Sequence, residues 1–451
     1  MKKGRYAKFW SQFDTVKEGA RRNGVFLAVW PPNAQDDWDI EPEYVYEDRW
    51  VLMDEHAHAD DSLHRYLGTD KAASTNDGPV KRVPLRDPQR DPMPDVVERI
   101  KRRPANDTTP NHLMSICDVN MCPADEPFPM PANAELWPSQ EPGDGGAGVD
   151  IRVIDTGLVK CHEEIPLLSQ NVTGNLNTLI DYRAERILTY GMHGSVIAGL
   201  IKSMAPKAVV EVTNALTMAG TALELDLGNA LCEALAKRPD IISLSAGTLT
   251  QNRRELLGLN RFWTELQDNG HTLLVAAAGN EGTVQALMPA ALGPSSGGAI
   301  LSVGALRADC TGLACFSNWG PDVQVYAPGE RLITLFTEGD YQYADPPVLH
   351  CRYHDPCLYC PCTCVTAPPE GAQVRFEGRA RWSGTSFATP IVAGLVASCM
   401  KEFDLDPRSA ARKLLQDKGF AFDLPLAHPA LPQRTGLALI PASIGRHALT
   451  T

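Results

Sequence analysis

Short apolar runs alternate with longer amphipathic stretches over the C-terminal two thirds of the chain. Apolar runs of about 4–8 residues bounded by turn residues predict strands, and longer segments with helical spacing predict helices. The expected strands are 149–154, 208–213, 240–245, 271–277 and 299–305. The expected helices are 193–203, 221–237, 253–268, 387–402 and 407–418. This alternation is typical of an α/β fold, a doubly wound and mostly parallel sheet with helices on both faces.

The first 70 residues follow a different pattern. A helix is expected over 9–21 and a second short one over 59–67, with strand-like runs at 24–30 and 49–53. These elements predict a small N-terminal α+β region. It contains no motif with a specific chemistry.

Residues 71–148 are rich in Pro, Asp and Gly and end in the glycine-rich stretch 143–148. We therefore expect a linker that runs over a surface. The predicted organisation is an N-terminal region (1–70), a linker (71–148) and a larger α/β domain (149–450). A cysteine-rich insertion is expected within the last of these, at about 337–377.

Composition limits the partners of the protein. The 451 residues are 43% hydrophobic, which is enough for a sizeable core. With 55 acidic against 42 basic residues the net charge is −13, which argues against nucleic acid and against an anionic membrane surface. No run reaches about 18 apolar residues, so no membrane span is expected. The basic start of the chain is not followed by an apolar signal segment, which favours the cytoplasm over secretion.

The most informative motif is Gly384–Gly394, in which a small hydroxyl residue, Ser386, precedes an apolar helix. At a helix N-terminus the unpaired backbone N–H groups and the helix dipole favour a negative oxygen beside that hydroxyl. Pro390 is expected in the first turn, where a missing N–H breaks no hydrogen bond. Ser386 is therefore a candidate nucleophile, although a simple helix cap explains this turn equally well when it is taken alone.

Three other residues supply what a serine nucleophile needs, namely a base, a carboxylate that orients the base, and a donor for the oxyanion. Asp155 ends the strand expected at 149–154, at the edge where open parallel sheets place their sites. His193 begins an expected helix, and Asn280 follows the strand expected at 271–277. Together with Ser386, these residues predict acyl transfer through a Ser/His/Asp triad.

Four motifs resemble those of the subtilisin-like serine proteases (subtilases, peptidase family S8), in the order of that family. They are Val153–Gly157, Met192–Leu200, Leu274–Gly282 and Gly384–Gly394, and the resemblance covers roughly 145–450. It implies a subtilisin-like α/β fold in a catalytic domain over 149–450, with a role for each of the four candidates. The N-terminal region ahead of such a domain is then either a propeptide-like module or an unrelated accessory domain. Asp155 would orient His193, the general base and then acid for Ser386, and Asn280 would form the oxyanion hole with the Ser386 backbone N–H.

The resemblance also implies a strand that pairs with an extended substrate. The residues expected to bind substrate are Ser245, Ala246, Gly247, Ala278 and Gly279. Two positions depart from the usual family sequence: Ser195 replaces the common Thr, and Ala246 the common Leu or Met. Neither belongs to the triad.

The function that follows is a serine endopeptidase that cleaves protein or peptide substrates through an acyl-enzyme, with no cofactor required for the chemistry. Ala286, Leu287 and Met288 are expected to line a shallow apolar pocket for the residue before the cleaved bond. The alternative is a latent enzyme, or a non-catalytic binding module on the same scaffold that acts through its N-terminal region or its cysteine-rich segment.

The segment 350–364 contains two histidines and five cysteines. The cysteines are Cys351, Cys357, Cys360, Cys362 and Cys364. Thiolates and imidazoles at short spacing suit a structural zinc site, and disulfides would stabilise the same segment equally well. Cys310 and Cys315, five positions apart, suggest a disulfide loop formed in an oxidising setting. Calcium is common in the family, but no carboxylate cluster here identifies a calcium site.

Overall fold

The computed structural model describes residues 6–37, 39–55, 63, 65–68, 78–103, 107–116, 126–344, 369–416, 421–425 and 435–442. The helices are α1 (Ala7–Arg22), α3 (Met93–Lys101), α4 (His193–Met204), α5 (Glu224–Ala236), α6 (Asn260–Asn269), α7 (Thr385–Phe403) and α8 (Pro407–Gln416). None of the helices within these ranges has the length and apolarity needed to cross a bilayer.

We call the described residues from 126 onwards the larger unit. A nine-stranded sheet forms its centre, in the order β18-β19-β15-β14-β13-β12-β6-β10-β7. Its strands are β6 (Asp150–Asp155), β7 (Val172–Gly174), β10 (Val209–Asn214), β12 (Ile241–Leu244), β13 (Leu273–Ala277), β14 (Ile300–Leu306), β15 (Val325–Pro328), β18 (Ala421–Pro425) and β19 (Thr435–Leu439). Every pair is parallel except β18 with β19. The predicted α/β fold with a mostly parallel sheet is therefore confirmed.

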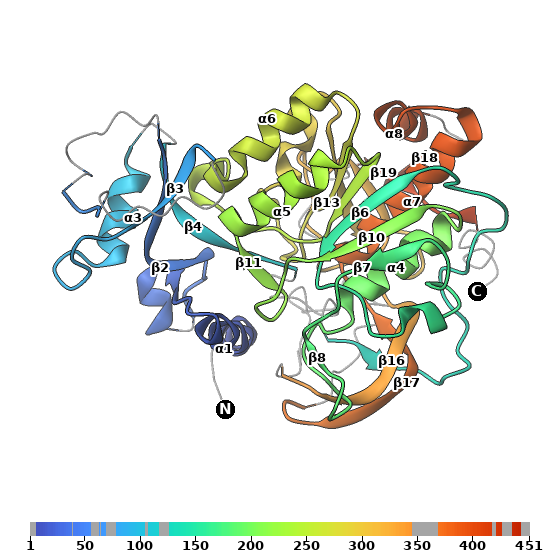
Figure 1. The fold of residues 1–451 in the computed structure, drawn as a ribbon, viewed down its shortest axis with the longest axis horizontal. Helices are drawn as coiled ribbons and strands as arrows, with labels where there is room; N and C mark the ends of the chain where they lie inside the picture. Colours follow the sequence, from blue (N-terminus) through green and yellow to red (C-terminus); the bar gives the residue numbers. More distant parts are fainter. Residues whose placement is uncertain are drawn as a thin grey trace.

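The central strands are apolar because both faces of the sheet are covered. All five residues of β13 are buried, as are all seven of β14. Helices α4 and α7 pack on one face, and α5 and α6 lie beside each other away from them (Figure 1). Most expected elements match the structure within a few residues, but α6 begins at Asn260 rather than at 253.

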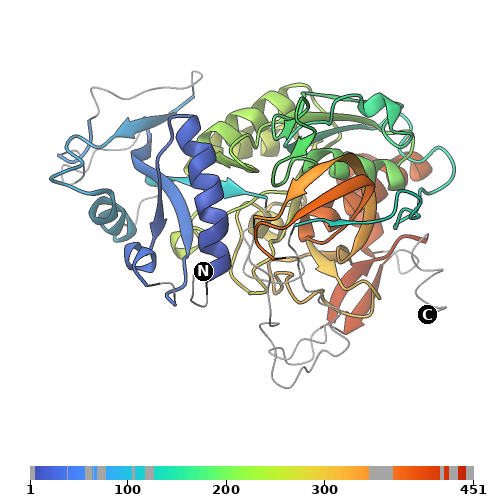
Figure 2. The same ribbon diagram turned by 90° about the horizontal axis from the view of Figure 1, so that it is seen from below.

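A second layer consists of an antiparallel hairpin, β16 (Leu332–Gln342) and β17 (Gln373–Trp382), extended by β5 (Phe128–Pro129), β8 (Ile180–Asp181) and β9 (Arg186–Ile187). The hairpin is the orange pair in Figure 2. It corrects the insertion expected at about 337–377, because both ends of that range are strands of this sheet. The intervening cysteine-rich segment lies outside the described residues.

The N-terminal region forms a separate five-stranded sheet at one side of the larger unit (Figures 1 and 2). It contains β1 (Leu27–Trp30), β2 (Tyr44–Asp54), β3 (Val80–Pro84) and β4 (Thr108–Ser115), and its last strand, β11 (Thr221–Leu223), comes from the larger unit. The helix expected at 59–67 falls mainly outside the described residues.

The linker predicted for 71–148 is wrong over 80–115, which contributes β3, α3 and β4 to the N-terminal sheet. The high Pro and Asp content of this stretch predicts a linker, although its elements contain fully buried apolar residues such as Val83, Val96 and Val97. Only tertiary packing reveals them, because the apolar runs are short and broken by Pro84, Pro92 and Pro94.

Candidate active site

Three of the predicted residues follow parallel strands that lie side by side. Asp155 ends β6, Ser245 follows β12, and Asn280 comes three residues after β13. Since β6, β12 and β13 are adjacent and parallel, their carboxyl ends meet at one edge of the sheet. The other two functional side chains come from helices that begin at the same edge: His193 is the first residue of α4 and Ser386 the second of α7.

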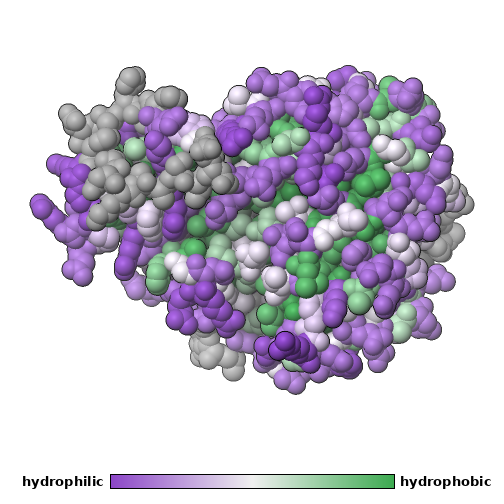
Figure 3. All heavy atoms as spheres, in the orientation of Figure 1, coloured by the Kyte–Doolittle hydropathy of each residue, from purple (hydrophilic) through white to green (hydrophobic). Residues whose placement is uncertain are grey.

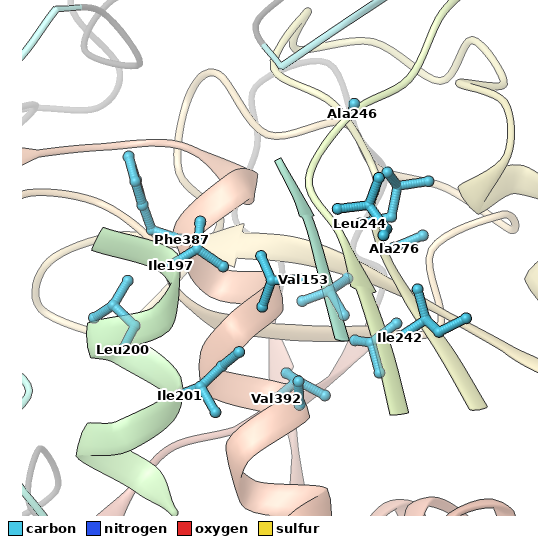
Figure 4. Close-up of a cluster of buried hydrophobic side chains, with 14 of the residues drawn as sticks. Val153, Ile197, Leu200, Ile201, Ile242, Leu244, Ala246, Ala276, Phe387 and Val392 are labelled. Atoms are coloured by element: carbon cyan, nitrogen blue, oxygen red, sulfur yellow. The ribbon is translucent and has the colours of Figure 1, made fainter. Parts of the chain in front are cut away.

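Apolar packing fixes the two helices against the sheet. Figure 4 shows Ile197 and Ile201 of α4 pointing towards α7, and Val392 on the side of α7 that is turned to the strands, as is Val153 of β6. All four side chains are fully buried. The start of α4 comes so close to the end of β6 that a Cβ on Gly194 would lie 2.6 Å from the carbonyl oxygen of Gly157. A glycine directly after His193 is therefore required for this approach.

Asp155 and His193 form a buried pair. The Nδ1 atom of His193 lies 2.8 Å and 2.9 Å from the two carboxylate oxygens of Asp155, and neither side chain is exposed. Thr156 N donates to Asp155 Oδ1 at 2.7 Å, which holds the carboxylate in place. With Nδ1–H donated to the carboxylate, Nε2 is the ring atom left to accept a proton.

Ser386 does not bond to His193 in this structure. Its hydroxyl donates to the carbonyl of Ile116 at 3.1 Å and approaches that of Ser245 at 3.4 Å. The Nε2 atom of His193 is buried and has no hydrogen-bond partner among the described residues. The structure thus brings Asp155 and His193 together, while the third member of the predicted triad is engaged by a peptide carbonyl.

Asn280 is oriented by Thr385, a residue that the sequence analysis did not assign. The Oδ1 atom of Asn280 accepts from Thr385 N at 2.8 Å and from Thr385 Oγ1 at 2.9 Å. This leaves the amide NH₂ of Asn280 as its free donor. Thr385 is adjacent to Ser386 in the sequence, but its partner Asn280 comes from the segment after β13, so only the fold reveals the contact.

Pro390 lies in the second turn of α7, not in the first as expected, because the helix begins at Thr385. Proline has no N–H, so residue 390 cannot donate the helical hydrogen bond to the carbonyl four residues earlier, that of Ser386. Ser245 Oγ donates to this carbonyl at 2.9 Å instead. The missing helical bond is thus replaced by one that links the end of β12 to the backbone of Ser386.

β4 lies between β11 and residues 245–247. We call the space between these two segments the strand site. Because β4 fills it, Ile116, which directly follows β4, reaches Ser386. β4 pairs antiparallel with β11, Met114 lying opposite Ala222. On its other side, Ser115 N donates to Gly247 O at 2.9 Å and Gly247 N to Ser115 O at 3.0 Å. The strand site therefore binds an extended chain through backbone hydrogen bonds on both of its sides, and Ser386 lies where that chain leaves the site.

The remaining predicted substrate-binding residues have other bonds. Ala278 N donates to Val303 O at 2.9 Å, and Ala278 O accepts from Asn318 Nδ2 at 2.9 Å. Gly279 N donates to Thr385 Oγ1 at 3.2 Å, and its carbonyl accepts from Asn318 N. These backbone groups hold the loop in place, so direct substrate binding by Ala278 and Gly279 stays a prediction.

A buried polar contact links β4 to the larger unit. His112 Nδ1 lies 2.7 Å from Glu224 Oε2, with the two side chains 4% and 0% exposed. Glu224 Oε1 accepts from Gly258 N at 3.0 Å, so both carboxylate oxygens are used. The sequence analysis missed this pair, since the two residues are 112 positions apart.

No group of three or more His, Cys, Asp or Glu side chains within the described ranges is placed to hold a metal ion. The five cysteines of the segment 350–364 lie outside those ranges, so the choice between zinc and disulfides stays open. Cys310 is a buried free thiol, and the disulfide suggested between it and Cys315 is therefore wrong. Burial raises the pKa of the Cys310 thiol to about 12.

Comparison with known proteins agrees with the geometry. A thermophilic serine proteinase of Bacillus sp. (strain AK1) is 29% identical over 206 residues, 44% of this chain and 48% of that protein. An intracellular serine protease of Paenibacillus polymyxa is 27% identical over 263 residues, 56% of this chain and 66% of that protein. The chain thus spans about half to two thirds of the length of these relatives.

Among solved structures, the patellamide maturation protease PatA is 24% identical, with a TM-score of 0.45, over 68% of this chain and 98% of that one. A cold-adapted subtilisin-like serine proteinase is 19% identical, with a TM-score of 0.44, over 66% and 91%. Residues 146–428, more than half of the chain, match the family described as the Subtilase family. The chain therefore belongs to the subtilase family.

Proposed function

We propose that this protein is a serine endopeptidase in which Ser386 is the nucleophile, His193 the general base and Asp155 the residue that orients His193. The observation that carries the proposal is the peptide carbonyl of Ile116, hydrogen-bonded to Ser386 Oγ at the end of the strand site. A hydroxyl that meets a peptide carbonyl beside a buried Asp–His pair is in the right place for acyl transfer.

In the proposed reaction, the substrate binds as an extended strand and Ser386 Oγ turns from Ile116 towards His193. Nε2 of His193 takes the hydroxyl proton while Oγ bonds to the scissile carbonyl carbon. The Asn280 amide and the Ser386 backbone N–H donate to the resulting oxyanion. His193 then gives its proton to the leaving amine, and a water molecule, deprotonated by His193, releases the acyl group.

The test is covalent labelling with a fluorophosphonate probe, combined with peptide turnover. Once β4 has left the strand site, the native chain should be labelled at Ser386, and Ser386→Ala should lose the label and about 10⁶-fold in turnover, the scale measured for such triads. Equal turnover by the Ser386→Ala variant would contradict the proposal.

We further propose that the described form is latent, with the N-terminal region acting as an inhibitor of its own catalytic unit. The support is direct: Met114 and Ile116, at 0% and 3% exposure, lie where an extended substrate would bind. Ser386 is itself only 1% exposed beneath this strand. Activity therefore requires that β4 leave the strand site.

A further inference from the structure

Beside the strand site lies a small pocket that the proposed mechanism has not used. Its lining residues come from three segments of the larger unit, with β4 across its mouth. They are Ser245, Ala246, Gly247, Ala277, Gly279, Asn280, Glu281, Leu287 and Thr385. Successive side chains of an extended strand point to opposite sides. The Ile116 side chain points away from the pocket, because its Cδ1 would lie 2.7 Å from a Cβ on Gly220. The next residue of a bound substrate, with its carbonyl at Asn280 and Ser386, therefore turns its side chain into this pocket.

Two glycines form opposite walls of the pocket, and one leucine fills the space between them. A Cβ on Gly247 would lie 2.5 Å from Leu287 Cδ2, and a Cβ on Gly279 would lie 2.9 Å from the same carbon. Leu287 is 6% exposed, so its side chain is inserted between the walls rather than turned to solvent. The main chain on each side holds it there: Thr248 and Met288 exchange two backbone hydrogen bonds, of 3.0 Å and 2.9 Å.

The pocket also contains a carboxylate, which could in principle select a basic residue. Glu281 is held behind the Gly279 wall, however, because a Cβ on Gly279 would lie 2.4 Å from Glu281 Oε2. The same oxygen accepts a hydrogen bond from Asn318 Nδ2. With Leu287 in front and Asn318 bound to it, the carboxylate does not offer an open site for an incoming lysine or arginine.

We infer that Leu287 restricts the residue before the scissile bond to small side chains, those of Gly, Ala, Ser or Cys. This inference rests on the proposed endopeptidase function and names its substrate class. A larger side chain would have to displace Leu287 from between Gly247 and Gly279, and overpacking of this kind is unfavourable. Removing the leucine side chain opens the pocket without touching Asp155, His193, Ser386 or Asn280.

The experiment is a cleavage profile on a peptide mixture, with cut sites read by mass spectrometry. The full-length chain is first incubated until its N-terminal fragment has been released, so that β4 no longer covers the pocket. Matched peptides with Ala or Phe before the cut site then give kcat/KM values. The native chain should prefer Ala by about 100-fold, the scale on which a pocket discriminates by fit. Leu287→Gly should lower this ratio at least about 10-fold by accepting Phe, and Leu287→Ala should lower it less. Leu287→Met, of similar volume, should keep it.

Leu176→Ala is the control for Leu287→Ala. It removes the same side-chain atoms, but from an exposed leucine (52%) that does not line the pocket. A thermal melt of each variant separates misfolding from altered specificity. A native preference for large apolar or basic residues, or an unchanged ratio in a folded Leu287→Gly variant, would overturn the inference while leaving Ser386-dependent cleavage intact. If the native chain, once its N-terminal fragment has been released, cleaves no peptide in a Ser386-dependent way, the proposed function fails together with the inference.

Discussion

The N-terminal region and the larger unit are stabilised in different ways. The larger unit has one extensive apolar core, built on β6, β12, β13 and β14 and covered by helices. The N-terminal region has two smaller apolar clusters, one under α1 and one under α3. In the view of Figure 3 both parts present a mostly hydrophilic surface, with apolar residues showing mainly in the centre of the larger unit.

The boundary between the two regions contains both apolar and polar contacts. Met218 and Leu223 of the larger unit belong to the apolar cluster under α1. The polar contacts are the backbone hydrogen bonds of β4 to β11 and to Gly247, and the buried His112–Glu224 pair. The catalytic geometry depends on the apolar core, which is held by many weak contacts. The proposed latency also depends on polar contacts of β4 that can be broken singly, so the two properties should be separable by mutation.

The largest effect should come from the proposed catalytic pair, Asp155 and His193. Asp155→Asn keeps the shape of the side chain but removes the negative charge that holds His193 Nδ1–H. We expect kcat to fall by about 10⁴-fold while folding is kept, because His193 then loses its correct tautomer. Steady-state peptide hydrolysis measures this. Asp268→Asn, on the exposed surface of α6, is the control, and an Asp155→Asn loss below about tenfold would contradict the assigned role.

The second prediction separates latency from catalysis. His112→Leu leaves the Glu224 carboxylate buried without its partner, which costs about 3–5 kcal/mol. In the Ser386→Ala background, amide exchange in β4 and β11 should be roughly 100-fold faster or more, while β13 keeps its protection.

His271→Leu provides the matched control for that exchange experiment. It breaks a similar pair, 2.9 Å to Asp240, that is partly exposed at 37% and 19%. Exposed pairs contribute about 1 kcal/mol or less, so β4 should be unaffected. Equal exchange of β4 in the two variants would show that the buried pair does not hold the N-terminal region.

The smallest effect concerns a charge inside the core of the larger unit. Lys202 of α4 is 2% exposed, and its Nζ donates to Ala208 O at 2.9 Å. Burial, with a smaller effect of Lys207, lowers the pKa of Lys202 to about 8. Between pH 8 and its ordinary value of about 10.5 the unfolded chain binds more protons, so this lysine makes stability rise with pH there.

Lys202→Met should therefore gain most in stability, relative to the native chain, below pH 8, and this advantage should shrink as the pH rises towards 10.5. Thermal melts in the Ser386→Ala background at several pH values measure the difference. Lys401→Met, with a side chain 44% exposed, should show no such trend. A constant difference between the Lys202→Met variant and its parent would contradict the lowered pKa.

The comparison of the two regions also explains what the sequence could predict. Asp155, His193 and Asn280 stand at the ends or starts of long apolar segments, whose periodicity is a local property. β4 gives no such signal, because Thr108–Ser115 is largely polar and contains Pro110. It is a buried strand only because β2 and β11 lie on either side of it. Thr385 and the His112–Glu224 pair likewise depend on partners from distant segments.

The central claim is that Ser386 makes this chain a protease held latent by its own N-terminal region. The most direct test follows the intact mass of the freshly purified native chain over time, beside the Ser386→Ala variant. The account predicts that the native chain loses an N-terminal fragment that includes Ile116, while the variant stays at full mass. Cleavage of both chains at the same rate, or a native chain that stays whole and takes up no fluorophosphonate, would contradict it.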